Sequence, residues 1–258
     1  MDRRIISVKH VTVKTKDVSR FIQATNDLLC RPESTEGMGV LWGTPGTGKT
    51  TALAYIVNVY DGIYIRAMTC SSITSILGDL CRAVGEERKL RKTDMVELIV
   101  TRLCKGDNGA PPPPPRPIFI DEADYLFKNF ELVDILRDIY DNSGCPVIMV
   151  GMEDIARKIR EHGRFARRIT QWIEFRGLDL EDTTQVAREC CEAELSEDLL
   201  NHLHRETAGN IGRVIIGLSK IEAFAKMNRK GKLTASDWKE KPLYFDQPTF
   251  GKHRNGKA

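Results

Sequence analysis

The residues with the clearest chemistry lie between positions 43 and 51. The segment Gly43-Thr44-Pro45-Gly46-Thr47-Gly48-Lys49-Thr50 follows an apolar run, residues 38–42, and precedes a helix-like stretch, residues 51–59. A strand, a glycine-rich turn and a helix in this order are typical of a phosphate-binding loop. Its glycines let backbone N–H groups turn toward phosphates, Lys49 reaches the same phosphates, and the Thr50 hydroxyl binds Mg²⁺. We therefore expect this segment to bind ATP with Mg²⁺.

Paired acids follow a second apolar run. Residues 117–120 are Pro-Ile-Phe-Ile, and Asp121-Glu122-Ala123-Asp124 come directly after them. At a strand end opposite a phosphate loop, Asp121 would hold Mg²⁺ and Glu122 would orient and deprotonate the attacking water. A kinase would not need this glutamate, so the pair favours ATP hydrolysis. The expected nucleotide contacts are Gly43, Thr44, Pro45, Gly46, Thr47, Gly48, Lys49, Thr50, Thr51 and Asp121.

Hydrolysis also needs positive charge on the γ-phosphate in the transition state, which is often supplied by another subunit. Two segments contain suitable arginines. Arg164-Phe165-Ala166-Arg167-Arg168 precedes the last expected strand, and Arg213 lies in Gly209-Asn210-Ile211-Gly212-Arg213. Taken alone, either segment is compatible with ordinary surface charge.

The elements that must position these residues alternate along the chain. Apolar runs of strand length alternate with stretches in which apolar residues recur at helical spacing, which predicts a parallel sheet with helices on both faces. The expected strands are residues 38–42, 62–68, 117–120, 146–151 and 171–175. The expected helices of this region are residues 16–30, 51–59, 71–84, 93–103 and 128–142.

The region after Asp179 is expected to contain helices and no further strand. Residues 179–191, 197–206 and 211–227 show helical patterns. We therefore predict an α/β nucleotide-binding domain over residues 1–177, a helical lid over 178–240, and a basic, flexible tail over 241–258. The proline-rich segment 106–115 is expected to be a loop, because proline is incompatible with helix interiors and inner strands.

Composition limits the class of protein. The chain has 258 residues, of which 41% are hydrophobic and 29% charged, with a net charge of +3. No apolar run approaches the ~18 residues that span a membrane, and the N-terminus lacks a signal-peptide core. The expected location is the cytoplasm of a bacterium or of a phage-infected host. The seven cysteines form no C-x-x-C pair and match no common zinc finger, so reduced thiols are expected.

The order of these motifs resembles the AAA+ ATPase family over residues ~16–228. The phosphate loop, the Ile-Phe-Ile-Asp-Glu-Ala-Asp strand, arginines before the fifth strand and a Gly-Asn-x-x-Arg helix follow one another as in that family. The resemblance implies that Arg167 or Arg168, with Arg164 a weaker choice, reaches the ATP of a neighbouring subunit. It also implies that Arg213 contacts nucleotide within its own subunit. The family's polar sensor after the fourth strand has no counterpart, because this chain has Gly151-Met152-Glu153.

Within that family the layout is similar to the transposition regulators, namely phage Mu transposition protein B, TniB and TnsC. This resemblance implies a homo-oligomeric filament or ring that binds double-stranded DNA without sequence preference and delivers it to a transposase. Cations at the matching positions would contact phosphates. The DNA contacts that the resemblance implies are Arg66, Arg88, Lys89, Arg91, Lys92 and Thr93. The extra N-terminal DNA-binding domain of Mu protein B has no counterpart before residue ~16.

Two other functions remain open at the level of sequence. One is a helicase-loading or replication-initiating ATPase similar to the DnaC or Orc/Cdc6 groups. The other is a nucleotide-switched signalling or secretion ATPase that does not bind DNA. An RNA helicase is disfavoured despite the Asp-Glu-Ala-Asp string, because it would need a second nucleotide-binding-type domain for which this chain is too short.

Overall fold

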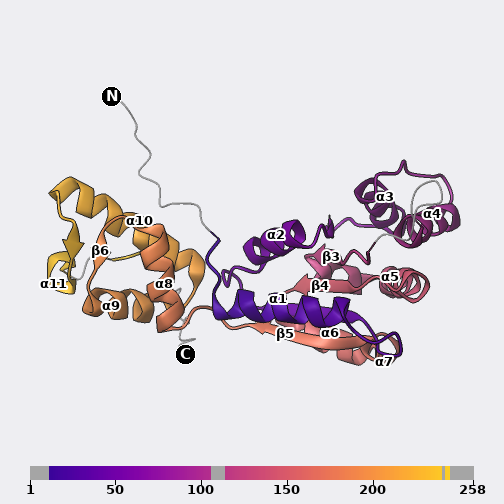
Figure 1. Cartoon of the computed structure of the whole chain (residues 1–258), viewed down its shortest axis with the longest axis horizontal. Helices are drawn as coiled ribbons and strands as arrows, with labels where there is room; N and C mark the ends of the chain where they lie inside the picture. Colours follow the sequence, from indigo (N-terminus) through magenta and orange to yellow (C-terminus); the bar gives the residue numbers. More distant parts are fainter. Residues whose placement is uncertain (1–11, 106–113, 240–241, 245–258) are drawn as a thin grey trace, which may run out of the picture. The chain divides into compact units, whose positions relative to one another are not determined.

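The computed structural model describes residues 12–105, 114–239 and 242–244, which fall into two compact units divided between Leu178 and Asp179. The first unit contains a five-stranded parallel sheet with the strand order β2-β3-β4-β1-β5. The predicted α/β fold with a parallel sheet flanked by helices is confirmed. The strands are β1 (Met38–Gly43), β2 (Ile63–Arg66), β3 (Ile118–Asp121), β4 (Val147–Gly151) and β5 (Ile169–Phe175) (Figure 1).

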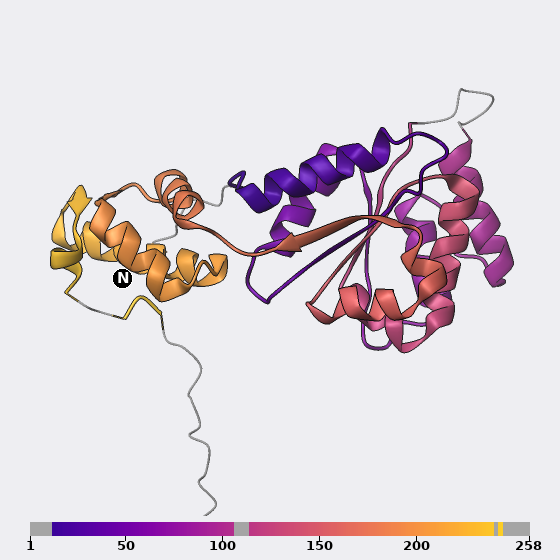
Figure 2. The same ribbon diagram turned by 90° about the horizontal axis from the view of Figure 1, so that it is seen from below.

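Helices cover both faces of this sheet, as Figure 2 shows. Helices α1 and α2 pack on one face, and the others pack on the opposite face. The helices are α1 (Lys16–Leu29), α2 (Lys49–Val59), α3 (Ile73–Ala83), α4 (Lys92–Cys104), α5 (Phe130–Ser143), α6 (Asp154–Glu161) and α7 (Gly163–Ala166), with a 3₁₀ helix, η2 (Ala123–Lys128).

The central strands are apolar except at the carboxyl end of β3, where Asp121 lies, because both of their faces are buried. Successive side chains of a strand point to opposite faces. In β3, Ile118 and Ile120 therefore enter the core under α3 to α7, whereas Phe119 enters the core under α1 and α2. There Phe21 makes edge-to-face contacts with Phe119 and Phe175, both at 6.1 Å between ring centroids. These two cores fix the strand ends that carry the candidate site.

The C-terminal unit is mostly helical but also contains two short strands, so the expectation of no further strand was wrong. Its helices are α8 (Leu180–Cys190), α9 (Glu197–Thr207), α10 (Ile211–Asn228) and α11 (Ala235–Trp238). Strands β6 (Glu194–Leu195) and β7 (Lys232–Leu233) pair in parallel, and Lys232 lies 2.7 Å from Glu194. Strands of two residues are too short to show a periodic pattern, which explains why the sequence did not reveal them.

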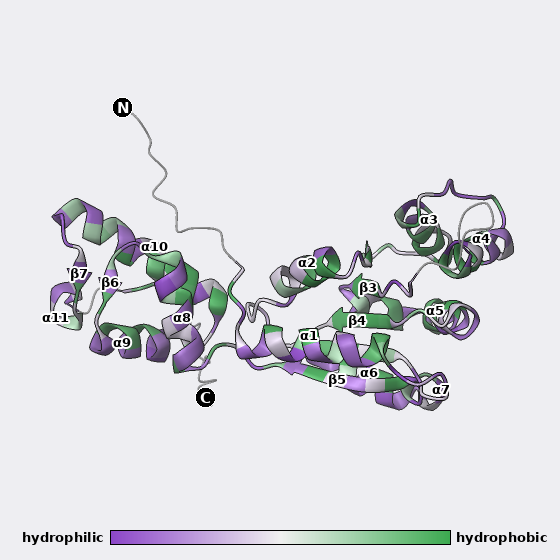
Figure 3. Ribbon diagram, in the orientation of Figure 1, coloured by the Kyte–Doolittle hydropathy of each residue, from purple (hydrophilic) through white to green (hydrophobic). Residues whose placement is uncertain are grey.

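The hydropathy pattern agrees with these elements. Figure 3 shows hydrophobic residues along the central strands, and both hydrophobic and hydrophilic residues along the helices of both units. Among the described residues, no helix is long and apolar enough to cross a membrane. Two predicted segments lie mostly outside the described residues. They are the proline-rich segment, of which residues 106–113 are not described, and the tail, of which residues 241 and 245–258 are not described.

Candidate ATP site

The phosphate loop lies between β1 and α2 and has the backbone of an anion site. Gly46 and Gly48 have φ values of 81° and 89°, in the left-handed region that glycine adopts most readily. Gly48 is the N-cap of α2 and provides no side chain to cap it. The first N–H groups of this 11-residue helix therefore have no capping side chain, and together with the helix dipole they suit a phosphate.

Lys49 is the buried cation of the loop, with 9% of its surface exposed. Its Nζ donates hydrogen bonds to the carbonyl oxygens of Gly43 at 2.6 Å and Thr44 at 2.8 Å. Burial lowers the pKa of Lys49, and the nearby carboxylates of Asp124 and Glu122 oppose that effect. An ammonium has three N–H donors, so one remains for a phosphate oxygen.

The paired acids end β3 at the same edge of the sheet. Asp121 is 4% exposed, and its Oδ1 accepts a hydrogen bond from the backbone N–H of Glu122 at 2.9 Å. Partial burial and the Asp121 charge raise the pKa of Tyr64, whose hydroxyl lies 3.4 Å from Asp121 Oδ2. Glu122 has a φ of 53°. This conformation is costly for a residue with a Cβ and is concentrated at functional sites.

The oxygen donors at this edge suit Mg²⁺. Thr50 is exposed in the first turn of α2, and the Asp121 carboxylate ends β3. Within the described ranges, no cluster of three or more histidine, cysteine, aspartate or glutamate side chains could hold a metal by itself. The Thr50 hydroxyl and the Asp121 carboxylate are oxygen ligands of the kind that Mg²⁺ uses together with water and substrate phosphates.

Asp124 is a residue of this edge that the sequence did not single out for a role. Its Oδ2 accepts a hydrogen bond from the backbone N–H of Met152 at 2.7 Å, just after β4. Its Oδ1 is buried and has no hydrogen-bond partner among the described groups, although Lys158 Nζ lies 3.9 Å away. A Cβ at Gly151 would come within 2.4 Å of Asp124 Oδ2. The glycine at the end of β4 was the signal that a neighbouring side chain approaches closely.

Arg66, expected to contact DNA, ends β2 beside the catalytic candidates. Its Nη2 lies 3.4 Å from Glu122 Oε1, and its side chain is 63% exposed. The pairing of β2 with β3 sets this contact, because Arg66 is in register with Asp121. Arg66 can therefore influence Glu122 directly, in addition to any contact with a phosphate.

The arginines before β5 differ in their surroundings. Arg168 is held within its own unit by Asp141 at 3.1 Å and Glu36 at 3.1 Å, and its hydrogen bonds to Asp141 raise its pKa. Arg164 and Arg167 are exposed, and neither forms an ion pair in the described part of the chain. The geometry thus favours Arg167 over Arg168 as the group that could reach another molecule.

Arg213 belongs to the C-terminal unit and lies in the first turn of α10. Its backbone N–H is bonded to the N-cap residue Asn210 at 3.1 Å. Its guanidinium stacks over the ring of Tyr244, with 4.9 Å to the ring centroid. The hydroxyl of Tyr244 in turn donates to the carbonyl oxygen of Glu206 at 2.8 Å. The side chain is therefore oriented by a neighbouring aromatic ring.

The remaining expected DNA contacts cluster between α3 and α4. Arg88, Lys89 and Arg91 are exposed in the connecting loop, and Lys92 and Thr93 begin α4. Lys92 and Thr93 also line a groove of about 520 Å³ between α4 and α5.

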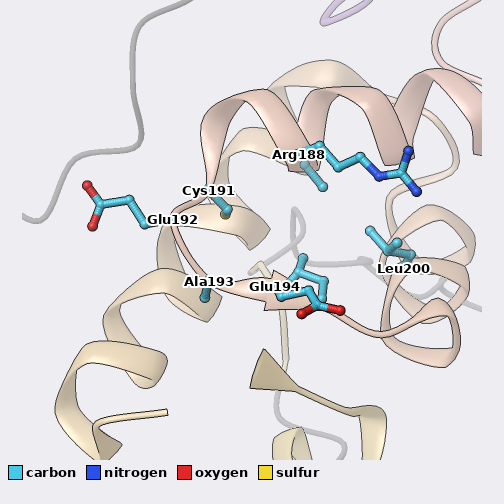
Figure 4. Close-up of a pocket in the computed structure, with 8 residues that line it drawn as sticks. Arg188, Cys191, Glu192, Ala193, Glu194 and Leu200 are labelled. Atoms are coloured by element: carbon cyan, nitrogen blue, oxygen red, sulfur yellow. The ribbon is translucent and has the colours of Figure 1, made fainter. Parts of the chain in front are cut away.

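A second hollow lies in the C-terminal unit and has different chemistry. Figure 4 shows this pocket of about 290 Å³, whose polar lining includes Arg188, Glu192 and Glu194. Glu192 is paired with Lys226 and Glu194 with Lys232, at 3.2 Å and 2.7 Å. None of the predicted site residues lines this pocket.

Solved structures with a similar fold include three archaeal proteins. The Orc1 protein of Aeropyrum pernix, in complex with DNA, is 16% identical with a TM-score of 0.59, and the match covers 91% of this chain and 65% of that one. Cdc6p from Pyrobaculum aerophilum is 18% identical with a TM-score of 0.63, covering 92% and 69%. The ORC2 protein of Aeropyrum pernix, in ADPNP–ADP complexes, is 16% identical with a TM-score of 0.63, covering 92% and 70%. The chain thus spans about two thirds of the length of these structures.

Sequence comparison gives a family for the nucleotide-binding region. No curated protein matches the chain. A family model described as an AAA domain matches residues 31–159, which include the phosphate loop, the paired acids and the end of β4. Since this match spans half of the chain, the protein belongs to the AAA domain family.

Proposed function

We propose that this protein is a Mg²⁺-dependent ATPase that assembles on double-stranded DNA and delivers it to a transposase. The observation that carries the catalytic part is the meeting of Lys49 with Asp121 and Glu122 at one sheet edge. There, Lys49 and the first N–H groups of α2 bind phosphates, and Thr50 and Asp121 hold Mg²⁺. Held by these two residues, Mg²⁺ would supply positive charge next to the phosphates. Glu122, in its left-handed conformation, orients and deprotonates the attacking water.

The described cations at this sheet edge are engaged, since Lys49 donates to the carbonyl oxygens of Gly43 and Thr44, Arg66 pairs with Glu122, and Lys158 lies 3.9 Å from Asp124. Exposed Arg167 has the chemistry of a cation for the γ-phosphate and makes no ion pair at its own described surface. We assign it to the ATP site of an adjacent copy, so that a homo-oligomer completes the catalytic site. We assign Arg213 to nucleotide sensing within its own copy. Under this assignment the C-terminal unit acts as the lid of the nucleotide-binding domain.

Binding to DNA is supported by the cationic segment 88–92, which contains four Lys or Arg residues and no acid. Such side chains contact phosphates and give affinity without sequence preference. The role in transposition rests on the resemblance of the sequence layout to the transposition regulators.

A second candidate function is replication initiation or helicase loading. It is favoured by a specific observation, the similarity of fold to the Orc1 and Cdc6 proteins over 91% and 92% of this chain. Both candidates share the ATP site and DNA binding, and they differ in sequence preference and in partner.

The test combines ATP, DNA and electron microscopy. With ATP or a slowly hydrolysed analogue, negative-stain images should show rings or filaments on duplex DNA of any sequence, and ADP should not support them. The Lys49→Ala protein is the matched control and should form none. Binding restricted to one origin-like duplex would favour the initiator. Absence of DNA binding at low salt would exclude both candidates and leave a nucleotide switch in signalling or secretion.

The transposase link needs its own measurement. Strand transfer by a candidate transposase should be directed to duplexes that carry the assembly. Strand transfer that ignores the bound duplex would remove the delivery role while leaving the DNA-binding ATPase intact.

A further inference from the structure

Leu90 is the most exposed large hydrophobic residue in the described chain, with its full surface open to solvent. It lies in the loop between α3 and α4, and its neighbours on both sides are cations: Arg88, Lys89, Arg91 and Lys92. None of these four forms a salt bridge with a described carboxylate. Transfer of this apolar surface from water into contact with a partner would be favourable.

The loop that carries Leu90 is held where it leaves α3. At the α3 end, Gly85 donates a backbone hydrogen bond to Arg82 at 3.0 Å, and Glu86 donates one to Cys81 at 2.8 Å. The methylenes of Arg88 lie over Gly78, where an added Cβ would be 3.1 Å from Arg88 Cδ. These contacts fix the start of the loop against α3.

At the other end, α4 begins directly after the loop with an N-terminus that suits an anion. Arg91 is its N-cap and makes no side-chain capping hydrogen bond. The first N–H groups of this 13-residue helix therefore have no capping side chain, and they follow the cations directly in the sequence. The loop offers phosphate-binding groups on both sides of one apolar side chain.

That combination identifies the kind of partner. A membrane-binding element needs a broad apolar face, usually with aromatic residues. A protein interface needs an apolar centre of several residues with few charges. Duplex DNA presents phosphates outside and stacked bases inside, and proteins that bend it insert single apolar side chains between base steps.

We propose that Leu90 is an apolar wedge that enters a base step of duplex DNA while Arg88, Lys89, Arg91 and Lys92 hold the flanking phosphates. This inference rests on the proposed DNA binding and adds a preference to it. Because unstacking is least costly where the duplex is deformable, the protein favours mismatched or pyrimidine–purine steps without reading base identity.

The experiment compares the full-length wild type, Leu90→Ala and Met227→Ala. Met227 is 81% exposed in the other unit and controls for loss of a surface hydrophobic residue. Each protein is titrated with ATP analogue onto a duplex that carries fluorophores at both ends, and onto the same duplex with one central mismatch. Thermal melts should be the same for all three, because neither side chain is packed.

Wild type and Met227→Ala should shorten the end-to-end distance of the duplex and bind the mismatched duplex about tenfold more tightly. Leu90→Ala should lose both effects and keep the salt dependence set by the cations. If Leu90→Ala still bends DNA and prefers the mismatch, the wedge is wrong and the proposed function stands. If the wild type does not bind DNA at low salt, the proposed function itself fails. Two further results would also overturn the wedge, because they would assign Leu90 to another surface. One is that Leu90→Ala alone loses self-association in the absence of DNA. The other is that Leu90→Ala alone loses binding to phosphatidylserine vesicles.

Discussion

The guanidinium of Arg66 lies 3.4 Å from the carboxylate of Glu122, so a residue at the end of β2 contacts the expected catalytic base at the end of β3. Free rotation of Glu122 toward a water molecule requires this contact to loosen. In the proposed complex with DNA, a phosphate would compete with Glu122 for the same guanidinium. The contact therefore gives the ATP site a direct route to sense charge outside it.

Substitution of Arg66 by alanine should raise hydrolysis in the absence of DNA and reduce its stimulation by DNA. The pair is largely exposed, so its strength is about 1 kcal/mol or less, and the expected rise is at most about fivefold. Phosphate release with and without duplex DNA measures both effects. Arg88→Ala is the control, because Arg88 does not contact Glu122 and its loss should leave DNA-free turnover unchanged. Equal turnover of Arg66→Ala and wild type under both conditions would contradict the prediction.

The two central site residues should separate binding from hydrolysis. Lys49→Ala should abolish nucleotide binding, since it removes the buried cation of the loop. Glu122→Gln should bind a fluorescent ATP analogue normally and hydrolyse ATP about 100-fold more slowly or worse, because the base is lost. Its DNA assemblies should persist after ATP is added. Rapid turnover by Glu122→Gln would assign the base to another residue.

Asp124 should contribute to the stability of the first unit. Asp124→Ala leaves the Met152 N–H without its acceptor, which should lower the free energy of unfolding by about 1–3 kcal/mol. Asp124→Asn retains an acceptor oxygen and should cost less. Urea unfolding compares both with Asp134→Ala, which removes a half-exposed carboxylate of α5 and should change little. Equal stability of Asp124→Ala and Asp134→Ala would show that the Met152 contact contributes nothing.

Arg167 and Arg168 should differ in what their loss affects. Arg168→Ala removes ion pairs with Glu36 and Asp141 and should lower stability by about 1 kcal/mol. Arg167→Ala should leave stability within about 0.5 kcal/mol of wild type. It should reduce turnover about 1,000-fold in the assembled state. Mixing Arg167→Ala with Lys49→Ala protein should restore part of the activity, because intact arginine from one copy meets an intact loop in the other. An inactive mixture that still assembles would place the arginine elsewhere.

Glu222 should make the C-terminal unit sensitive to acid. Burial raises the pKa of Glu222, but bonds from Lys226 and from the N–H groups of Ala193 and Glu192 outweigh this and lower it below its ordinary 4.5. The stabilisation from Glu222 is therefore present above about pH 4.5 and is lost as the pH falls through the lower folded value.

The measurement uses the buried Trp238, with Trp42 and Trp172 replaced by phenylalanine so that fluorescence reports on the C-terminal unit. Urea midpoints should fall between pH 5 and pH 3, and Glu222→Gln should flatten that fall. Identical pH profiles for the two proteins would exclude Glu222 as the source.

The sequence was most informative where the chemistry is local. The phosphate loop and the strand that ends in Asp121 are short contiguous patterns, and the apolar runs predicted the parallel sheet correctly. Contacts between segments that are distant in the sequence could not be predicted from such local patterns. The approach of Arg66 to Glu122 depends on the register of β2 against β3, and that of Asp124 to Met152 depends on the neighbouring strand.

The arginines before β5 illustrate the same limit. Arg167 and Arg168 are adjacent and of one type, so spacing cannot distinguish them. The difference lies in Glu36 and Asp141, which come from distant parts of the chain and hold only Arg168. The short strands β6 and β7 were missed for a related reason, since two residues carry no periodic signal.

The bond from Met152 to Asp124 has a mechanical consequence. Backbone pairing of β3 with β4 reaches only Ile120 and Met149, whereas β4 remains paired with β1 as far as Gly151. Beyond Met149, the hydrogen bond from the Met152 N–H to the Asp124 carboxylate connects the segment after β4 with the segment after β3. The segments after β3 and β4 can therefore move apart when this one side-chain hydrogen bond is exchanged. The backbone pairing of β3 with β4 up to Ile120 and Met149 is kept in that movement.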